Sequence, residues 1–358
     1  MPTTITSSDD AALRELCAQL RLLAGDLEGA DAWPAEQLQL CADYGVFEWF
    51  ITPELGGQGW TEAEILRGYL KLSAACLTTT FVITQRMGAC RRIAVSHQEE
   101  MKRTQLPDLL RGRKFATVGI SHLTTSRRHL TKPVLRAKES ADGFVLDGFS
   151  PWVTGAPHAD LVVIGATLSD GRQILANLDT RLPGVSVPAP VNLVGLSASK
   201  TGPVHCQDVE ISRDAILAGP VEGVMSQGVG AKTGGLQTST LAIGLADAAI
   251  DLVEAEATNR PEFVAASVAL RRTWSSLRDD LLTHADGDEV CSNEELRIRA
   301  NSLALRAAQT ALAAAKGTGF VVGHPAGRWC REALFFLVWS CPQPVIAANL
   351  CELAGITD

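Results

Sequence analysis

Residues 115–129 of this chain read FATVGISHLTTSRRH, and residues 142–164 read DGFVLDGFSPWVTGAPHADLVVI. The first stretch ends in a turn rich in hydroxyl side chains. The second begins with Asp142-Gly143, a pair typical of tight hairpins, and has two short β-type runs. Between these runs stands Trp152-Val153-Thr154. The region therefore predicts β-structure that carries an aromatic side chain and several hydroxyls.

Similar short runs continue to about residue 187, separated by Ser-Asp-Gly and Leu-Pro-Gly turns. On both sides of this region the apolar residues recur at three and four positions, which is the period of an amphipathic helix. We therefore predict an α+β fold in three parts. These are an N-terminal helical domain (1–114), a central antiparallel β-barrel or sandwich (115–218) and a C-terminal four-helix bundle (219–358).

The last part has three long helical segments, at roughly 226–258, 262–284 and 291–316. A fourth helix is expected from about Gly327 to Ala354. Pro342-Gln343-Pro344 must bend or break it, because proline removes an amide donor and clashes with the preceding turn. Four helices of this length predict an up-down bundle.

Composition narrows the class of protein. With 358 residues, 46% of them hydrophobic and 20% charged, the chain can bury a large core. The net charge is −8, and Lys and Arg are scattered along the sequence, so we expect no nucleic-acid binding.

The nine cysteines have no C-X-X-C pair and no histidine at zinc spacing, so no metal site is predicted. Most of them fall in apolar helical patterns, as buried free thiols do in a reducing compartment. No secretory signal pattern opens the chain, and no uninterrupted apolar run is long enough to span a bilayer. We expect a cytoplasmic protein without membrane association.

Four sequence motifs, in this order, resemble those of the acyl-CoA dehydrogenase superfamily. PELGGQG at 53–59 resembles the family's PEELGGQG loop, and the region quoted above resembles its flavin-binding β-domain. LVGLSAS at 193–199, with Val209, resembles its LG-X-R-X-S…DV region, and RPEF at 260–263 matches its R-X-X-F element. The matches run from about residue 30 to the C-terminus, so the resemblance implies an acyl-CoA dehydrogenase-like fold.

The resemblance also implies bound FAD, held by two segments of the β-domain. Ser121 stands at the position of the family's TEP threonine, and His122 replaces the acidic residue after it. Arg260 and Phe263 would serve the cofactor of a neighbouring subunit, since a guanidinium can hold two phosphate oxygens. The cofactor-binding residues implied by the resemblance are Val118, Ser121, Ser126, Trp152, Thr154, Arg260, Phe263, Gly317 and Gly319.

The family's catalytic glutamate has no counterpart in this chain. It usually lies in a Y-E-G-T step nine residues after an arginine, and the same count from Arg331 gives Trp339-Ser340-Cys341-Pro342. Ser340 therefore stands where the base is expected. Cys341 and His122 are the other candidate catalytic side chains, and a lone turn histidine is also common as a purely structural residue.

Some members carry the glutamate on the first helix of the C-terminal bundle instead. That position falls at Gly234 or Gly235 here. The nearest carboxylates, Glu222 and Asp247, do not fit the count, although a shifted loop would bring Glu222 closer. Standard dehydrogenase chemistry is therefore not expected.

Three functions remain open on this evidence. The first is an FAD-dependent oxidoreductase that oxidises an acyl thioester or related small molecule with a non-standard base. The second is a flavin-dependent monooxygenase, and the third is a catalytically silent flavoprotein or partner subunit. We also expect a homodimer or homotetramer, because one subunit is not expected to cover the apolar bundle residues Leu303, Leu312, Phe335, Phe336 and Leu337.

Overall fold

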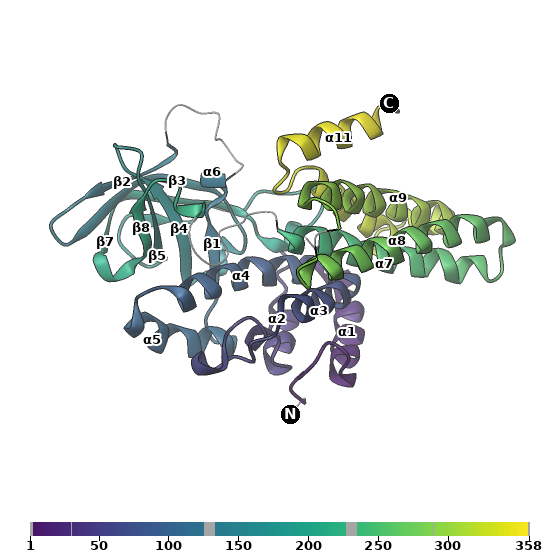
Figure 1. Ribbon diagram of the computed structural model, residues 1–358, viewed down its shortest axis with the longest axis horizontal. Helices are drawn as coiled ribbons and strands as arrows, with labels where there is room; N and C mark the ends of the chain where they lie inside the picture. Colours follow the sequence, from purple (N-terminus) through teal and green to yellow (C-terminus); the bar gives the residue numbers. More distant parts are fainter. Residues whose placement is uncertain (1–2, 30, 125–132, 227–234, 289, 357–358) are drawn as a thin grey trace.

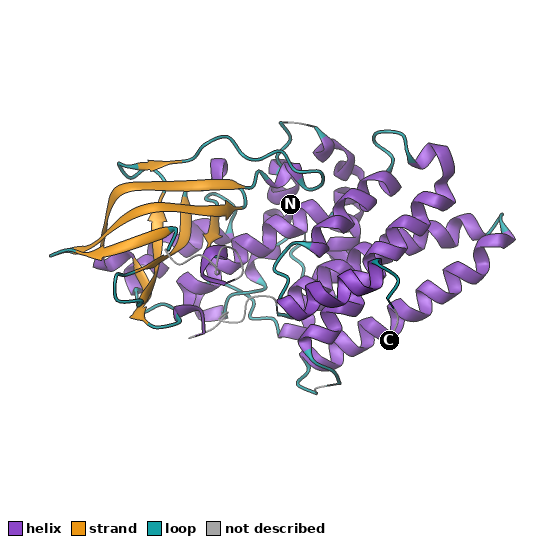
Figure 2. Cartoon of the chain, turned by 90° about the horizontal axis from the view of Figure 1, so that it is seen from above, coloured by secondary structure: helices purple, strands orange, loops and turns teal. Residues whose placement is uncertain are grey.

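The computed structural model describes residues 3–29, 31–124, 133–226, 235–288 and 290–356. Helices form the first part of the chain, an eight-stranded sheet the second and helices the third, as predicted. Figure 1 shows the sheet at one end of the molecule, with α4 and α5 beneath it, and the long helices α7, α8 and α9 projecting from the other end. Figure 2 shows the same division from above.

The N-terminal helices begin where short polar side chains cap them. The Asp10 carboxylate accepts from the amide of Ala12, and Thr61 and Glu64 form a reciprocal capping box. The predicted leucine stripe of the first helix is largely buried, with Leu13, Leu16 and Leu20 inside the core. The helices of this part are α1 (Ala11–Leu23), α2 (Ala35–Asp43), α3 (Glu62–Ala75), α4 (Leu77–Val95) and α5 (Glu99–Leu110).

The sheet has the strand order β6-β7-β3-β2-β4-β5-β8, with β1 paired to β4. It is not wholly antiparallel, since β1 and β4 pair in parallel and β2 meets β4 in parallel at Arg136 and Thr167. The chain between β1 and β4 is long enough to return in the same direction, as a parallel pair requires. The strands are β1 (Ala116–Gly119), β2 (Leu135–Glu139), β3 (Gly143–Val153), β4 (Leu161–Thr167), β5 (Gln173–Asp179), β6 (Val185–Ser186), β7 (Gly202–Ser212) and β8 (Ile216–Val221).

Three long helices build the bundle: α7 (Leu236–Ala257), α8 (Val264–Ala285) and α9 (Asn293–Gly319). Helix α7, although interrupted by polar residues, is long and apolar enough to cross a membrane, judged by length and composition alone. However, 78% of its most apolar window is buried inside the protein. Such burial is typical of a core helix, so α7 gives only weak evidence for a membrane span.

The last part of the chain differs from the single bent helix that we predicted. Helix α10 (Pro325–Ala333) passes into a 3-10 turn at Leu334–Leu337, and α11 starts afresh at Gln343–Leu353. The break therefore lies before the prolines. Ser340, between the two pieces, has a φ of 50°, in the left-handed region.

The prediction of which apolar bundle residues are exposed was partly wrong. Leu303 and Phe336 are fully buried within the subunit. The exposed large apolar side chains of the bundle lie elsewhere. They are Val264, Val268, Val290, Phe320, Val321, Val322, Leu334, Val338, Leu350, Leu353 and Ile356.

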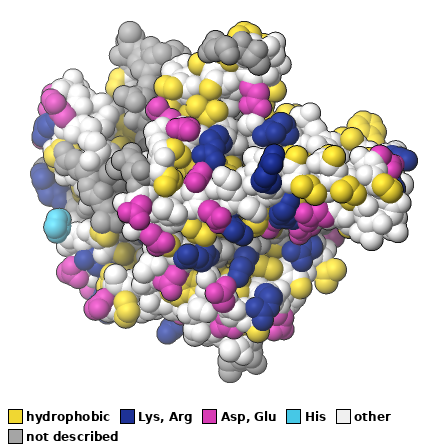
Figure 3. Space-filling view, turned by 45° about the vertical axis from the view of Figure 1, so that its right-hand side comes forward, with side chains coloured by type: hydrophobic (Ala, Val, Ile, Leu, Met, Phe, Trp, Pro, Cys, Tyr) yellow, Lys and Arg dark blue, Asp and Glu magenta, His cyan; other side chains and the backbone are white. Residues whose placement is uncertain are grey.

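Charges on the surface are mixed. On the face shown in Figure 3, Lys and Arg side chains lie interspersed with Asp and Glu, and hydrophobic side chains are also visible on the projecting part at the right. This distribution differs from the single basic stripe of a typical nucleic-acid-binding face.

Candidate active site

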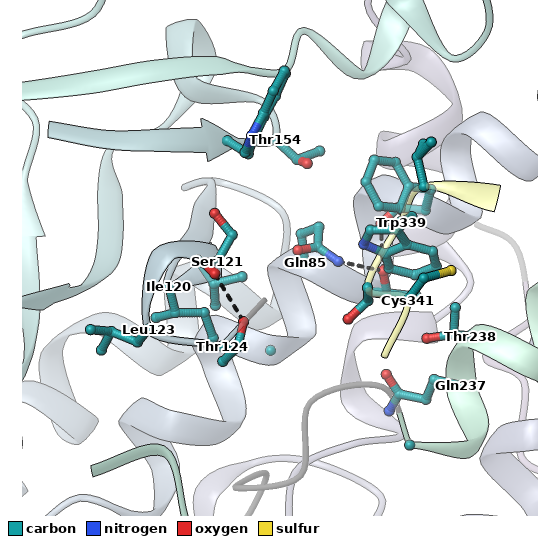
Figure 4. Close-up of a pocket in the computed structure, with 18 of the residues that line it drawn as sticks. Gln85, Ile120, Ser121, Leu123, Thr124, Thr154, Gln237, Thr238, Trp339 and Cys341 are labelled. Carbon is teal, nitrogen blue, oxygen red and sulfur yellow. Dashed lines mark hydrogen bonds between the residues drawn. The ribbon is translucent and has the colours of Figure 1, made fainter. Parts of the chain in front are cut away.

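A cavity of about 2240 Å³ lies where the three parts of the chain meet. Typical small-molecule sites measure about 300–1,000 Å³, so this cavity has room for a dinucleotide together with a substrate. Its walls come from α4, from β1 and α6, from the end of β3, from the start of α7 and from the segment between α10 and α11. Figure 4 shows Ser121 and Thr154 on one side and Trp339, Cys341 and Thr238 on the other.

Ser121 and His122 lie on a single helical turn, α6 (Ser121–Thr124), directly after β1. The Ser121 hydroxyl is buried and finds no hydrogen-bond partner among the described residues. His122 Nε2 lies 2.8 Å from the carbonyl oxygen of Gly165, while its Nδ1 is buried without a partner. Burial lowers the pKa of His122, so the ring is neutral near pH 7.

The end of β3 supplies the second β-domain segment. Trp152 lines the cavity and remains 47% exposed, although most tryptophans in this protein are largely covered. Thr154 is buried, and its hydroxyl shares a hydrogen bond of 3.2 Å with Thr201. Val118 on β1 also lines the cavity. The structure thus brings Val118, Ser121, Trp152 and Thr154 together; Ser126 lies outside the described residues.

Ser340 and Cys341 line the same cavity, as predicted from the count. Helix α9 holds this segment in place. The buried Arg297 donates from Nη2 to the carbonyl of Trp339 at 2.9 Å, and Asn301 donates to the carbonyl of Phe336 at 2.9 Å. The Cys341 thiol in turn donates to the carbonyl oxygen of Phe336 at 3.2 Å.

Sequence reasoning missed the wall formed by α4. Phe81, Thr84, Gln85 and Gly88 all line the cavity, at the three- and four-residue spacing of one helix face. The spacing was visible in the sequence, but a stripe that mixes aromatic, polar and glycine positions does not stand out as an apolar pattern. Gln237 and Thr238, at the start of α7, face the cavity as well.

The remaining predicted cofactor residues form a second group at the far end of the bundle. Arg260 donates to the carbonyl of Ala314 and to Glu256, and its guanidinium lies 4.3 Å over the ring of Phe263. Two further members, Gly317 and Gly319, follow Ala314 on the last turn of α9. Because α7 has 22 residues, Arg260 lies roughly 33 Å along the helix from the cavity-lining residues at the start of α7, and none of this group lines the cavity.

Neither Glu222 nor Asp247 supplies a base on the cavity wall beside Ser340. Asp247 is held by Arg271 at 2.5 Å, and neither Asp247 nor the exposed Glu222 lines the cavity. Glu332, next to Arg331, is fully buried and accepts from the Thr78 hydroxyl at 3.1 Å. Burial raises the pKa of Glu332 to about 7, but its side chain is absent from the cavity wall.

Comparisons with known proteins agree with this architecture. No family model matches the chain. A probable acyl-CoA dehydrogenase of Bacillus subtilis is 24% identical over 238 residues, which are 64% of this chain and 62% of that protein. The short-chain specific acyl-CoA dehydrogenase of Rattus norvegicus mitochondria is 22% identical over 351 residues, 90% of this chain and 84% of the relative.

Among solved structures, a glutaryl-CoA dehydrogenase from Mycobacterium smegmatis in complex with FADH2 has a TM-score of 0.79 at 18% identity, covering 97% of this chain and 96% of the other. The three-part order and the cavity at its junction therefore define an acyl-CoA dehydrogenase fold. The sequence relatives, at 22% and 24% identity, agree with the resemblance to the acyl-CoA dehydrogenase superfamily. The predictions of an oxidoreductase and of FAD as its cofactor agree with what these relatives are named for and with the FADH2 bound in the solved structure.

The cavity suits a flavin on its own evidence. An isoalloxazine ring needs hydrogen-bond partners along its pyrimidine edge and an aromatic or apolar wall. The orphaned hydroxyl of Ser121 and the half-exposed ring of Trp152 meet these needs. Among the described residues, no group of three or more His, Cys, Asp or Glu side chains is placed to hold a metal ion.

Proposed function

We propose that this protein is an FAD-dependent oxidoreductase that oxidises an acyl thioester or a related small molecule without a glutamate at the usual position. The observation that carries the proposal is the shared cavity. Its β-domain wall holds Ser121, Trp152 and Thr154, and its opposite wall holds Ser340 and Cys341. The residues proposed to contact the cofactor would therefore face Ser340 and Cys341 across the same cavity.

Each side chain has a definite task in this proposal. Ser121 and Thr154 bind the polar edge of the cofactor, and Trp152 packs against it. Phe81, Phe335 and Trp339, whose rings lie 4.8–5.0 Å apart, keep water from the reacting carbon. When bound, FAD supplies the electron acceptor of the reaction.

His122 is the side chain best suited to accept a proton. Its Nε2 faces the Gly165 carbonyl, an acceptor, so the neutral ring carries its proton on Nε2 and leaves the Nδ1 lone pair available. Ser340 cannot act alone, because a hydroxyl is a very weak base at neutral pH. We expect His122→Gln to lower turnover by about 10²–10⁴ without loss of FAD, whereas Cys341→Ser should have a small effect.

A monooxygenase is the second candidate. It is favoured by one feature of the wall: among the described lining residues the only carboxylate is Glu62, on α3. A monooxygenase needs no carboxylate base to remove a substrate proton. Anaerobic mixing of the FAD-loaded protein with substrate separates the two candidates, because only a dehydrogenase-type enzyme is reduced by its substrate directly.

We further propose that the protein works as a homodimer or homotetramer in the cytoplasm. The second group, with Arg260 at its centre, does not line the cavity of its own subunit. Two details support a neighbour's cofactor there. The buried Nε of Arg260 has no partner among the described residues, and a side chain at Gly317 would meet nothing within 4 Å of the same subunit.

The test is FAD titration of the purified protein, followed by absorbance and by light scattering. We expect one FAD per chain and an assembly of at least two 38.1 kDa chains. Failure to bind FAD would exclude both enzyme proposals and leave the silent partner subunit. An FAD-loaded monomer would exclude a role for Arg260 at a neighbour's cofactor.

A further inference from the structure

Arg297, on α9, is a buried cation with few hydrogen-bond partners. The residue is 3% exposed, and its Nη2 donates to the carbonyl oxygen of Trp339 at 2.9 Å. Its Nε and Nη1 are buried and have no hydrogen-bond partner among the described residues. The guanidinium carbon lies 5.9 Å from the ring centres of Phe336 and Trp339, at the limit of a cation–π contact. Buried charges are normally paired with an opposite charge, yet no carboxylate in the described part of the chain forms an ion pair with Arg297.

The Cys341 thiol lies beside this guanidinium, on the side of the cavity. Burial lowers the pKa of Arg297 to about 10, and the effects that raise it come from the neighbouring Cys341 sulfur. The thiol donates to the carbonyl oxygen of Phe336 at 3.2 Å, and that oxygen also accepts from Asn301 at 2.9 Å. Cys341 lines the cavity, whereas Arg297 does not. A small molecule in the cavity can therefore reach the sulfur atom, with the guanidinium behind it.

The other eight cysteines lack this combination of a cavity and a buried arginine. Cys341 is the one cysteine among the described lining residues. Cys351, on α11, is exposed and serves as the reference for an accessible thiol. Burial raises the pKa of the remaining seven, which keeps them in the less reactive thiol form. They are Cys17, Cys41, Cys76, Cys90, Cys206, Cys291 and Cys330. A thiol that is open to a cavity and lies next to a guanidinium is in the environment where cysteines react with oxidants.

We propose that hydrogen peroxide oxidises Cys341 to a sulfenic acid, which Arg297 holds as its anion. In this step the sulfur forms a bond to one peroxide oxygen, and the O–O bond breaks. The thiol proton leaves with the other oxygen as water, so the sulfur is oxidised by two electrons and the peroxide is reduced. The sulfenic acid then releases its proton to solvent. Its charged oxygen accepts from the guanidinium, whose Nε and Nη1 are the donors without a partner among the described residues.

The test measures oxidation of each cysteine in the native protein. The reduced full chain is treated with hydrogen peroxide and dimedone, a diketone that traps sulfenic acids, and peptide mass spectrometry follows the labelling with time. We expect Cys341 to be labelled at least about tenfold faster than Cys351. Exposure alone predicts the opposite order, because Cys341 is 9% exposed and Cys351 is an exposed residue. The assay needs no substrate and no turnover, so it is independent of the proposed function. Labelling of Cys341 at or below the rate of Cys351 would overturn the inference.

Variants show whether the guanidinium causes this selectivity. Arg297→Gln, which removes the charge, should slow the labelling of Cys341 by about tenfold, and Arg297→Lys should retain part of the rate. The control is Arg299→Gln, which should leave the rate unchanged, because Arg299 is paired with Asp280 at 2.7 Å. An unchanged rate in a folded Arg297→Gln variant would overturn the role of Arg297. If that variant does not fold, the Arg297→Lys rate and the order of Cys341 and Cys351 in the native protein decide the question.

Discussion

The two ends of the helical bundle differ in the kind of group that has no contact within the described part of the subunit. At the cavity end, the Ser121 hydroxyl and His122 Nδ1 have no hydrogen-bond partner among the described residues, and both residues line the cavity. At the far end, Arg260 is anchored by Ala314 and Glu256, but the surface beside it is open. Phe320 and Val322, just after α9, are 85% and 87% exposed.

This difference indicates which kind of binding partner each end suits. The cavity end suits a small molecule, because its unpartnered atoms among the described residues are buried hydrogen-bonding groups in residues that line the cavity. The far end lacks a protein surface, because contiguous exposed apolar side chains are uncommon on monomers and mark interaction sites. One second subunit would cover the apolar residues and bring Arg260 to a cofactor at the same time.

The largest effect is expected from a charge placed in the open surface. Phe320→Asp should yield 38.1 kDa monomers and weaken FAD binding by at least about 100-fold, since a buried carboxylate in an apolar interface is very costly. The matched control is Leu22→Asp, on α1, where an equally exposed leucine lies outside the bundle. Light scattering and FAD titration report both changes. If the Phe320→Asp variant forms dimers that bind FAD as tightly as the native protein, the far end of the bundle is not the proposed subunit interface.

The next effect concerns Arg260 itself. Arg260→Ala should weaken FAD binding by about 10- to 100-fold in an intact oligomer, because a charge-assisted hydrogen bond to phosphate contributes about 1.5–3 kcal/mol. Arg271→Ala, which removes an arginine held by carboxylates on α7, is the control and should leave FAD affinity unchanged. Equal FAD affinities of the Arg260→Ala and Arg271→Ala variants would show that Arg260 does not contact the cofactor.

At the cavity end the single substitutions should act more weakly. Ser121→Ala and Thr154→Val each remove one neutral hydroxyl, worth about 0.5–1.5 kcal/mol, and should raise the Kd for FAD about 2- to 12-fold. Light scattering should show the native assembly in both variants. An unchanged Kd in both would mean that the flavin edge lies against other groups.

The smallest predicted effect is a pH dependence of stability. The folded-state pKa of Glu332 is about 7, above the ordinary value of 4.5, so the folded protein holds an extra proton between these values. Stability from this group is full below about pH 4.5 and is lost as pH rises through 7. Between pH 5 and 8, the Tm of the native protein should fall about 3–6 °C more than that of Glu332→Gln. The exposed Glu262→Gln should follow the native curve, and parallel curves for all three proteins would contradict the assignment.

The fold was predictable because its signals are local. The leucine period of α1 and the Asp-Gly turns of the sheet each depend on a few neighbouring residues. The count along the chain also pointed to Ser340, which lines the cavity, because such a count needs no tertiary information. The parallel pairing of β1 with β4 was missed because strand direction depends on the connection as a whole, which periodicity does not encode.

The parts of the site that escaped prediction depend on contacts between distant segments. Arg92 reads in sequence as an ordinary helical arginine, and only its fold-back onto Gly88 beside β1 places it in the cavity wall. Burial of Leu303 and Phe336 depends on how closely α9 packs against α10 and its following turn, which sets the exposed surface of the bundle.

The most direct test of the central claim is an anaerobic assay of the native protein with straight-chain acyl-CoA esters and an artificial electron acceptor. The claim is that this cavity holds FAD but has no carboxylate base beside Ser340. It predicts turnover at background level for these esters, with a trace gained in Ser340→Glu. Native turnover on the order of 1–10³ s⁻¹, the ordinary range of enzymes, would contradict it.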